Sequence, residues 1–251
     1  MRDTRPAGRS VLITGAGSGL GAATAVRLSA DGHHVHLTGR RADPLVRVAG
    51  LITEAGGVAT VHLLDVTDPD TGREVVARVV AESGRLDVLV NNAGVFRRGT
   101  ASQLSVDDWH TTIQTNLTGA FHMAQSAVAA FRAQDRVCGV RGHVLNVNSG
   151  AGLSGYAPGA AYSASKFGLM GLSDALRREV GAEGIKVSDI VVAAAVESEL
   201  SGRSGVRRLP AADVARAIQA VLAMPGDAVL SRVDLTQLDP APDQTENTRQ
   251  S

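Results

Sequence analysis

Short apolar runs alternate with longer helix-compatible stretches along almost the whole of this chain. Seven runs are rich in β-branched residues and mostly continuous in their apolar character, which is typical of strands buried on both faces of a parallel sheet. They are Ser10–Thr14, Val35–Thr38, Val58–Leu64, Val88–Asn91, His143–Asn148, Ile185–Val192 and Ala228–Val233. The expected helices lie between them, at Gly19–Ala30, Pro44–Ala55, Pro69–Ser83, Val106–Arg132, Ala161–Gly181 and Ala211–Ala223. This alternation predicts an α/β fold, a doubly wound parallel sheet of about seven strands with helices on both faces.

The alternation is not interrupted by a linker-like segment or an internal repeat. We therefore expect one domain over residues 9–235. Residues 1–8 and 236–251 lack apolar periodicity and are expected to be flexible tails.

Two of the expected helices carry a start signal. Asp43 and Asp68 each precede a proline, and Pro44 and Pro69 suit the first turn of a helix. We therefore expect Asp43 and Asp68 to be the N-caps of the second and third helices.

Composition and charge argue against several classes of function. The chain has 25 basic and 25 acidic residues, so nothing favours a polyanion partner such as nucleic acid. Its 3% of aromatic residues also argues against a base-stacking platform. Neither a signal peptide nor an apolar run of membrane-spanning length is evident. We expect a cytoplasmic protein without nucleic-acid or membrane partners.

The sequence offers no convincing metal site. Cys138 is the single cysteine. His33, His34 and His36 gather at the start of the second expected strand, without a carboxylate or cysteine at ligand spacing. We therefore expect no catalytic metal.

A glycine-rich turn joins the first expected strand to the first expected helix, and it reads Thr14-Gly15-Ala16-Gly17-Ser18-Gly19-Leu20-Gly21. Glycines allow positive φ and a close backbone approach, and the N–H groups of the helix N-terminus attract an anion. A bland tight turn is the alternative, but the strand before and the helix after favour phosphate binding. The expected contacts are Gly15, Gly17, Ser18, Gly19 and Leu20.

The end of the second expected strand indicates which dinucleotide, NAD(H) or NADP(H), the glycine-rich turn would bind. An acid at this position binds a ribose 2′-hydroxyl, whereas an arginine accommodates a 2′-phosphate. The segment Leu37-Thr38-Gly39-Arg40-Arg41 has no acid, and the planar guanidinium of Arg40 suits a phosphate. NADP(H) is therefore favoured over NAD(H). The alternative is that Arg40 is simply a solvated side chain.

Two further strand ends fit the adenine end of such a site. Leu64-Asp65-Val66 closes the third expected strand, where the Asp65 carboxylate can accept a hydrogen bond from an adenine amino group. Asn91-Asn92-Ala93-Gly94 closes the fourth, at the sheet edge where ligands bind. We assign Asp65, Val66, Asn91, Ala93 and Gly94 to the cofactor site, with local turn capping as the alternative for the asparagines.

Tyr162-Ser163-Ala164-Ser165-Lys166 carries the strongest chemical signal. The tyrosine and the lysine lie one turn apart on one helical face, and a nearby ammonium is expected to lower the pKa of Tyr162 so that it exchanges a proton. Both residue types occur only twice in the chain, which argues against a chance surface pair. Ser149, thirteen residues before Tyr162, ends the fifth expected strand and is able to donate a hydrogen bond to a substrate oxygen.

Together these motifs resemble the short-chain dehydrogenase/reductase family. The match comprises the turn Thr14 to Gly21, the segment Asn91 to Gly94, the helix asparagine in Thr115-Asn116-Leu117, and the spacing of Ser149, Tyr162 and Lys166. It covers roughly Ser10 to Val233. The resemblance implies a Rossmann-type oxidoreductase that moves hydride between a nicotinamide cofactor and a ketone, aldehyde or secondary alcohol.

The resemblance also implies the catalytic roles. Tyr162 would be the general acid/base and Ser149 would polarise the carbonyl. Lys166 would bind the nicotinamide ribose and depress the pKa of Tyr162. Asn116 would hold a water that links Lys166 to solvent. A homotetramer or homodimer packed through the helices Val106–Arg132 and Ala161–Gly181 is implied as well.

The chain departs from the family pattern after the sixth expected strand. Ala193-Ala194 stands where the family commonly has Pro-Gly, a change that loosens nicotinamide binding, shifts the substrate pocket or has little effect. The Val196 backbone and the Ser198 hydroxyl are the expected partners of the carboxamide. This departure also keeps open a different class of function, a non-catalytic dinucleotide-binding sensor.

Overall fold

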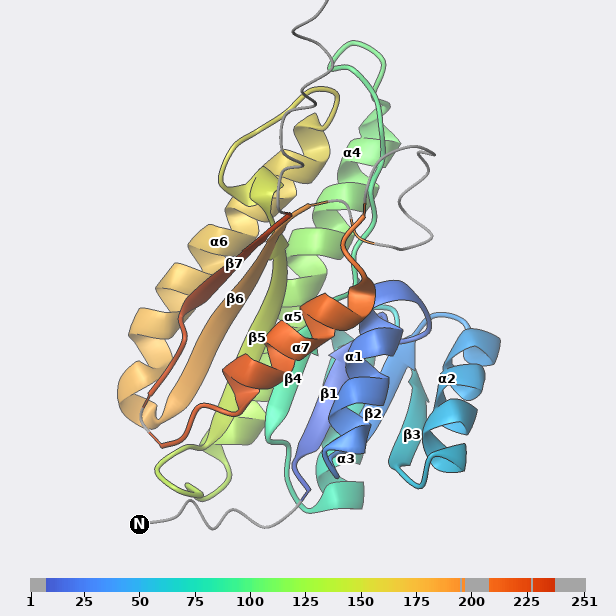
Figure 1. The fold of residues 1–251 in the computed structure, drawn as a ribbon. Coiled ribbons are helices and arrows are strands. Elements are labelled where there is room, and N and C mark those ends of the chain that lie inside the picture. Colours follow the sequence, from blue (N-terminus) through green and yellow to red (C-terminus); the bar gives the residue numbers. More distant parts are fainter. Residues whose placement is uncertain (1–7, 195, 197–207, 227, 238–251) are drawn as a thin grey trace, which may run out of the picture.

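A parallel sheet of seven strands lies at the centre of the protein, in the order β3-β2-β1-β4-β5-β6-β7 (Figure 1). The computed structural model describes residues 8–194, 196, 208–226 and 228–237. The strands are β1 Ser10–Thr14, β2 His34–Gly39, β3 Val58–Leu63, β4 Val88–Asn91, β5 Gly142–Ser149, β6 Ile185–Ala193 and β7 Arg232–Thr236. The chain first builds outward from β1 to β3, then returns to pair β4 with β1. Ligands bind at the carboxyl ends of the strands beside this reversal point.

Helices cover both faces of the sheet, as predicted (Figure 1). They are α1 Gly19–Ala30, α2 Ala42–Glu54, α3 Pro69–Ser83, α4 Val106–Ile113, α5 Gly119–Arg132, α6 Ala160–Val180 and α7 Ala211–Leu222. Short segments of other helical types are the π-helical η1 Gln114–Thr118 and the 3₁₀ turns η2 Gly150–Gly152 and η3 Gly181–Glu183. No helix in the described part of the chain is long and apolar enough to span a membrane.

Two hydrophobic cores lie on opposite faces of the sheet. In β1, Val11 and Ile13 point into the core shared with α1, α2 and α7, whereas Leu12 points into the core shared with α3 and α5. All three side chains are fully buried. Because successive side chains of a strand alternate between faces, a strand covered on both sides needs apolar residues at every position. This requirement explains the continuous apolar runs in the sequence.

The structure corrects the bounds of the seventh predicted strand and the N-cap of the second predicted helix. β7 is Arg232–Thr236 rather than Ala228–Val233, since its register is set by pairing Asp189 of β6 with Arg232. Its last residue also lies one position inside the predicted tail of residues 236–251. α2 begins at Ala42, so its N-cap is Arg41 and not Asp43, although Pro44 does lie in the first turn. Asp68, in contrast, is the N-cap of α3, and it accepts hydrogen bonds from Asp70 N and Thr71 N.

The predicted helix Val106–Arg132 is interrupted by the π-helical turn η1. Asn116 lies within this turn and is buried. Its Oδ1 accepts from the Val95 N–H at 2.8 Å, and its Nδ2 donates to the Val95 carbonyl at 2.9 Å. These two hydrogen bonds hold η1 against the segment that follows β4. π-turns inside α-helices occur frequently at functional sites.

Candidate active site

A cavity of about 830 Å³ lies at the carboxyl ends of the central strands. It is within the range of volumes typical of small-molecule sites. Its walls come from the residues that end or directly follow β1, β2, β4, β5 and β6, and from parts of α1, α2, η2 and α6. The lining includes predicted site residues from both ends of the dinucleotide: Gly15, Gly17, Ser18, Gly19, Leu20, Arg40, Ala93, Gly94, Ser149, Tyr162, Lys166 and Val196. The structure thus gathers residues that lie up to 181 positions apart, from Gly15 to Val196.

The glycine turn forms a narrow backbone cradle on one side of this cavity. Gly15 has φ +67°, a conformation that side chains with a Cβ rarely adopt. A Cβ on Gly21 would lie 2.3 Å from the Gly15 carbonyl oxygen and 2.6 Å from Asn92 Nδ2, so this position admits glycine alone. The turn therefore brings bare backbone to the cavity wall, as the sequence predicted.

The N-terminus of α1 is open to an anion. Its N-cap, Ser18, makes no side-chain capping bond, and the first turn contains no acidic residue. The first N–H groups of a helix lack partners within the helix, and the helix dipole adds partial positive charge at this end. Together with the glycine cradle, this geometry fits the pyrophosphate of a dinucleotide.

Sequence reasoning missed the residues that brace the cradle. Thr14 Oγ1 accepts from the N–H groups of Asn92 and Ala93, each at 3.0 Å. Asn92 Nδ2 donates to the Thr14 carbonyl at 2.9 Å, and Asn92 itself lines the cavity. These bonds join the ends of β1 and β4, which are adjacent only in the folded sheet.

Asn91, which was assigned to the cofactor site, is placed elsewhere. It is buried in β4, and its Nδ2 donates to the Ala120 carbonyl and to Asn146 Oδ1. The Asn91 side chain thus joins β4 to β5 and α5, and its assignment to the cofactor site stays a prediction. Because side chains alternate along a strand, Asn91 points away from the edge that its neighbour Asn92 lines.

Arg40, which follows β2, lines the cavity where the adenosine end of a dinucleotide is predicted. Its side chain is exposed, and it makes no ion pair within the described part of the chain. Gly39, Arg41 and Pro44 line the same region. Asp65 and Val66 follow β3 and are not part of this lining; Asp65 Oδ1 accepts from the Thr67 N–H and hydroxyl. The assignment of Asp65 and Val66 to the adenine stays a prediction.

Ser149, Tyr162 and Lys166 meet at the other end of the cavity. The Ser149 hydroxyl hydrogen-bonds Tyr162, and its oxygen also accepts from the Ala151 N–H at 3.2 Å. Lys166 Nζ lies 5.7 Å from the centroid of the Tyr162 ring and donates to the Val147 carbonyl at 2.8 Å. Phe96 packs edge-on against the Tyr162 ring, with 5.1 Å between centroids. The three groups are thus positioned by β5, η2 and α6.

The pKa of Tyr162 moves in the direction opposite to the one predicted. Burial raises the pKa of Tyr162 and outweighs its hydrogen bond with Ser149, which lowers it. Burial also shifts the pKa of Lys166, lowering it to about 8, and outweighs the negative charge of Asp189, which raises it. The expectation from helical spacing was wrong because it considered the charge of Lys166 and not the removal of both side chains from water. Tyr162 is therefore a neutral phenol near pH 7 in the protein alone.

Asn116 and Lys166 lie on neighbouring elements, and the donors of Asn116 are fully used. Besides the Val95 carbonyl, Asn116 Nδ2 bonds Ser165 Oγ at 3.1 Å, and Ser165 in turn donates to the Tyr162 carbonyl at 2.7 Å. Through Ser165, Asn116 thereby connects η1 to the turn of α6 that contains Tyr162 and Lys166. Among the described residues, Lys166 has one acceptor, so two of its three ammonium donors remain for a ligand or water. The predicted water held by Asn116 stays a prediction.

A buried polar network around Asp189 holds the backbone of Ser149 in place. Sequence analysis did not predict this network. Asp189 of β6 accepts from Ser173 Oγ at 2.8 Å and from Asn148 Nδ2 at 3.4 Å, and it pairs with Arg177 at 3.1 Å. Asn148 Oδ1 accepts from the Ser149 N–H at 2.9 Å. The network therefore fixes the backbone of Ser149 against β6. In the sequence, Asn148 and Asp189 lie within apolar strands, Ser173 and Arg177 lie in a helix, and no spacing signal joins them.

The stretch after β6 is only partly described. Ala193 and Ala194 both line the cavity, and a Cβ on Gly150 would lie 3.0 Å from the Ala193 Cβ. Val196 lines the cavity and bridges to Leu209. Ser198, the other expected carboxamide partner, lies outside the described residues. So does most of the loop to Leu209.

Comparison with known proteins gives the same family as the motifs. Residues 9–205 match the family model described as short chain dehydrogenase. The chain is 38% identical to trans-4-hydroxycyclohexanecarboxylate dehydrogenase of Sinomonas cyclohexanicum, over 74% of this chain and 72% of that protein. It is 34% identical to a 3-oxoacyl-acyl-carrier-protein reductase of Thermotoga maritima, over 73% and 72%. The chain belongs to the short-chain dehydrogenase/reductase family.

A solved structure extends the likeness across the whole fold. Actinorhodin polyketide ketoreductase with NADPH has a TM-score of 0.83 and 28% identity, with 91% of this chain and 95% of that chain covered. This protein is an NAD(P)-dependent oxidoreductase.

Proposed function

We propose that this protein is an NADPH-dependent reductase of ketones or aldehydes, which also catalyses the reverse oxidation of secondary alcohols. The observation that carries the proposal is the cavity whose one end holds Arg40 and whose other end holds Ser149, Tyr162 and Lys166. The reductase named above and the ketoreductase solved with NADPH support a carbonyl substrate. A bound NADPH supplies the hydride in such chemistry.

The residues around the reacting carbon each have one task in this proposal. The Ser149 hydroxyl, whose oxygen already accepts from the Ala151 N–H, donates a hydrogen bond to the substrate carbonyl oxygen, keeps its own proton and holds that oxygen in place. Tyr162 gives its phenolic proton to that oxygen as negative charge develops. Lys166 holds the nicotinamide ribose through its two remaining donors and stabilises the phenolate that forms. With its pKa raised by burial, Tyr162 holds its proton at neutral pH and is able to act as the acid in reduction.

The cofactor preference rests on Arg40. Its guanidinium lines the cavity and has no carboxylate partner in the described part of the chain, so it is available to a 2′-phosphate. We expect Arg40→Ala to weaken NADPH binding about tenfold or more and to leave NADH binding nearly unchanged, because charge-assisted hydrogen bonds are worth about 1.5–3 kcal/mol. Fluorescence titration of both cofactors measures this. Arg47→Ala, on the exposed side of α2, is the matched control.

The titration also distinguishes the proposed function from its alternatives. Equal or tighter NADH binding by the wild type would remove Arg40 from the site and turn the substrate search towards alcohol oxidation. If neither cofactor bound, Ala193-Ala194 would become the central departure from the family. Cofactor binding without turnover of a broad carbonyl panel would instead favour a dinucleotide sensor.

A further inference from the structure

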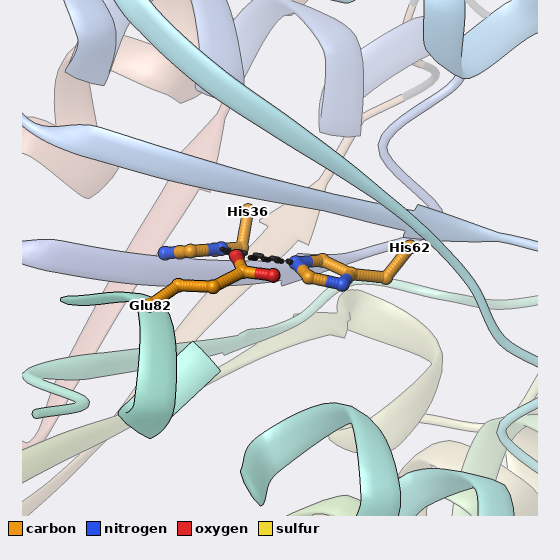
Figure 2. Close-up of side chains that lie close together, drawn as sticks. All are labelled: His36, His62 and Glu82. Carbon is orange, nitrogen blue, oxygen red and sulfur yellow. Dashed lines mark hydrogen bonds and ion pairs between the residues drawn. The ribbon is translucent and has the colours of Figure 1, made fainter. Parts of the chain in front are cut away.

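Two histidines and a glutamate converge on the side of the sheet that α3 covers, and none of them lines the cofactor cavity (Figure 2). His36 lies in β2, His62 in β3 and Glu82 in the last turn of α3. His36 Nδ1 is 3.0 Å from His62 Nε2. Glu82 Oε2 is 3.7 Å from each of these nitrogens. Three elements thus present one donor atom each to a common point.

These separations match those of a metal coordination shell. With bonds of about 2.0–2.1 Å, two ligands of a tetrahedral ion lie roughly 3.3–3.4 Å apart. The three observed separations fall on both sides of that value. An ion between the donors therefore requires shifts of a few tenths of an ångström, and no backbone rearrangement.

The chemistry of the donors selects the kind of ion. Two imidazole nitrogens and one carboxylate oxygen suit zinc and its transition-metal neighbours, whereas calcium and magnesium prefer shells of oxygen ligands. Burial lowers the pKa of His36 to about 3 and also lowers the pKa of His62. Both imidazoles are therefore neutral near pH 7, which is the form that binds metal.

The surrounding contacts orient His36 as a ligand. Its other nitrogen, Nε2, lies 2.9 Å from Ser83 Oγ, which is 3.1 Å from His34 Nδ1. His34 Nε2 then lies 2.9 Å from Thr60 Oγ1. If His36 Nε2 carries the proton, each member of this chain donates to the next and Nδ1 keeps its lone pair for a cation. Hydrogen bonds of this kind fix the tautomer and ring orientation of metal-bound histidines.

Access and charge are also compatible with an ion. His36 is fully buried and His62 nearly so, but the Glu82 side chain is 42% exposed, so the cluster opens to solvent on the glutamate side. Arg78 lies close enough to lower the pKa of His62 and opposes a cation, although it pairs with Glu74 at 3.5 Å.

We propose that His36, His62 and Glu82 form a binding site for one zinc or similar transition-metal dication, with water as the fourth ligand. The ion would join β2, β3 and α3 at the edge of the sheet. No residue of this site is shared with the cofactor cavity, so the proposal does not depend on the reductase function.

The test uses the full chain without a histidine tag, treated with EDTA and dialysed. We expect calorimetric titration with ZnCl₂ to give one site per chain, and titration with CoCl₂ to give the visible absorption of four-coordinate cobalt. Glu82→Gln and His62→Gln should each weaken zinc binding more than about 100-fold, and Ser83→Ala about 10- to 100-fold, as outer-shell changes do. Glu54→Gln and His110→Gln change exposed residues away from the cluster and are the matched controls.

Thermal unfolding gives a second readout. Saturating zinc should raise the Tm of the wild type and of both controls, and should not raise that of Glu82→Gln. Glu82→Gln alters an exposed carboxylate, so loss of binding in a variant that unfolds at the wild-type Tm without metal cannot be ascribed to misfolding. Absence of zinc binding by the wild type, or equal binding by wild type and Glu82→Gln, would overturn the proposal.

Discussion

At the residue scale, burial sets the pKa values of Tyr162 and Lys166, the pair that we propose to be catalytic. Tyr162 and Lys166 are both withdrawn from water, and burial moves the pKa of the tyrosine up and that of the lysine down. Both shifts favour the neutral side chain. In the protein alone, the phenol of Tyr162 therefore carries its proton near neutral pH.

The role of Tyr162 is tested by removing its hydroxyl. Tyr162→Phe keeps the ring that packs against Phe96, so folding and cofactor affinity should be nearly unchanged. We expect kcat to fall at least about 100-fold, because general acid/base groups typically contribute 10²–10⁴-fold. Steady-state kinetics and cofactor titration on the same preparation separate the two effects. Activity that survives this substitution would remove Tyr162 from its assigned role.

Lys166 gives the folded state a defined pH dependence. Its pKa is about 8 in the folded protein, below the ordinary value of 10.5, so between these values the unfolded chain binds more protons. Stability therefore rises with pH in this window. From pH 7.5 to 9.5 we expect Lys166 to contribute roughly 2 kcal/mol of increase in the free energy of unfolding. Urea denaturation of wild type and Lys166→Met at both pH values measures the contribution, which should be absent in the variant.

At the element scale, helix N-termini divide into two kinds. Ser105 at the start of α4 accepts from the Asp108 N–H at 3.0 Å, and Asp68 caps α3 in the same way. Ser18 at the start of α1 makes no such bond. Capped helices satisfy their own first turn, whereas α1 presents its N–H groups to the cavity. The same residue type therefore stabilises one helix and leaves another open to a ligand.

A pair of serine variants checks this division. Ser105→Ala removes a capping bond and should lower the free energy of unfolding by about 1 kcal/mol. Ser18→Ala removes no such bond and should change it by less than about half of that. Urea denaturation without cofactor measures both variants. Equal losses would mean that Ser18 caps α1 in solution and that its N-terminus is less open than the structure indicates.

At the scale of the whole molecule, the exposed helices offer a surface for self-association. Trp109, Phe121 and Phe167, on α4, α5 and α6, are large apolar side chains that are each at least 39% exposed. A Cβ on Gly168 would meet Leu117 within the same chain, whereas a Cβ on Gly171 would meet nothing within 4 Å. Gly168 thus serves internal packing, and Gly171 leaves room for another helix. We propose a homodimer or homotetramer built on these helices.

Light scattering after size-exclusion chromatography tests this assembly. The wild type should elute as a dimer or tetramer, and Phe167→Glu should shift it towards the monomer because a carboxylate is costly to bury. Val46→Glu, on exposed α2 of the opposite face, should leave the mass unchanged. A monomeric wild type would contradict the proposed assembly.

The sequence alone determined the class of fold, because covering a parallel sheet on both faces forces continuous apolar strands between amphipathic helices. It also indicated the glycine turn from its place between strand and helix, and the Tyr162–Lys166 pair from helical spacing, whereas Ser149 was added by the resemblance to the family. The sequence did not predict contacts between residues that are distant along the chain. These are the bonds of Thr14 with Asn92 and of Asn148 with Asp189, and the burial of the Asn91 side chain. The direction in which the pKa of Tyr162 shifts depends on its burial, and burial cannot be read from the spacing of residues in the sequence.

The His36, His62 and Glu82 cluster shows the same limit. Histidine clustering was visible around His34, but the partners lie 26 and 46 residues beyond His36 and no ligand spacing joins them. Pairing of β2 with β3 and the packing of α3 over both strands bring them within 4 Å of one another. Local propensity and periodicity belong to the sequence, whereas sheet register, burial and the meeting of distant donors are decided by the tertiary structure, because they depend on which elements pack together.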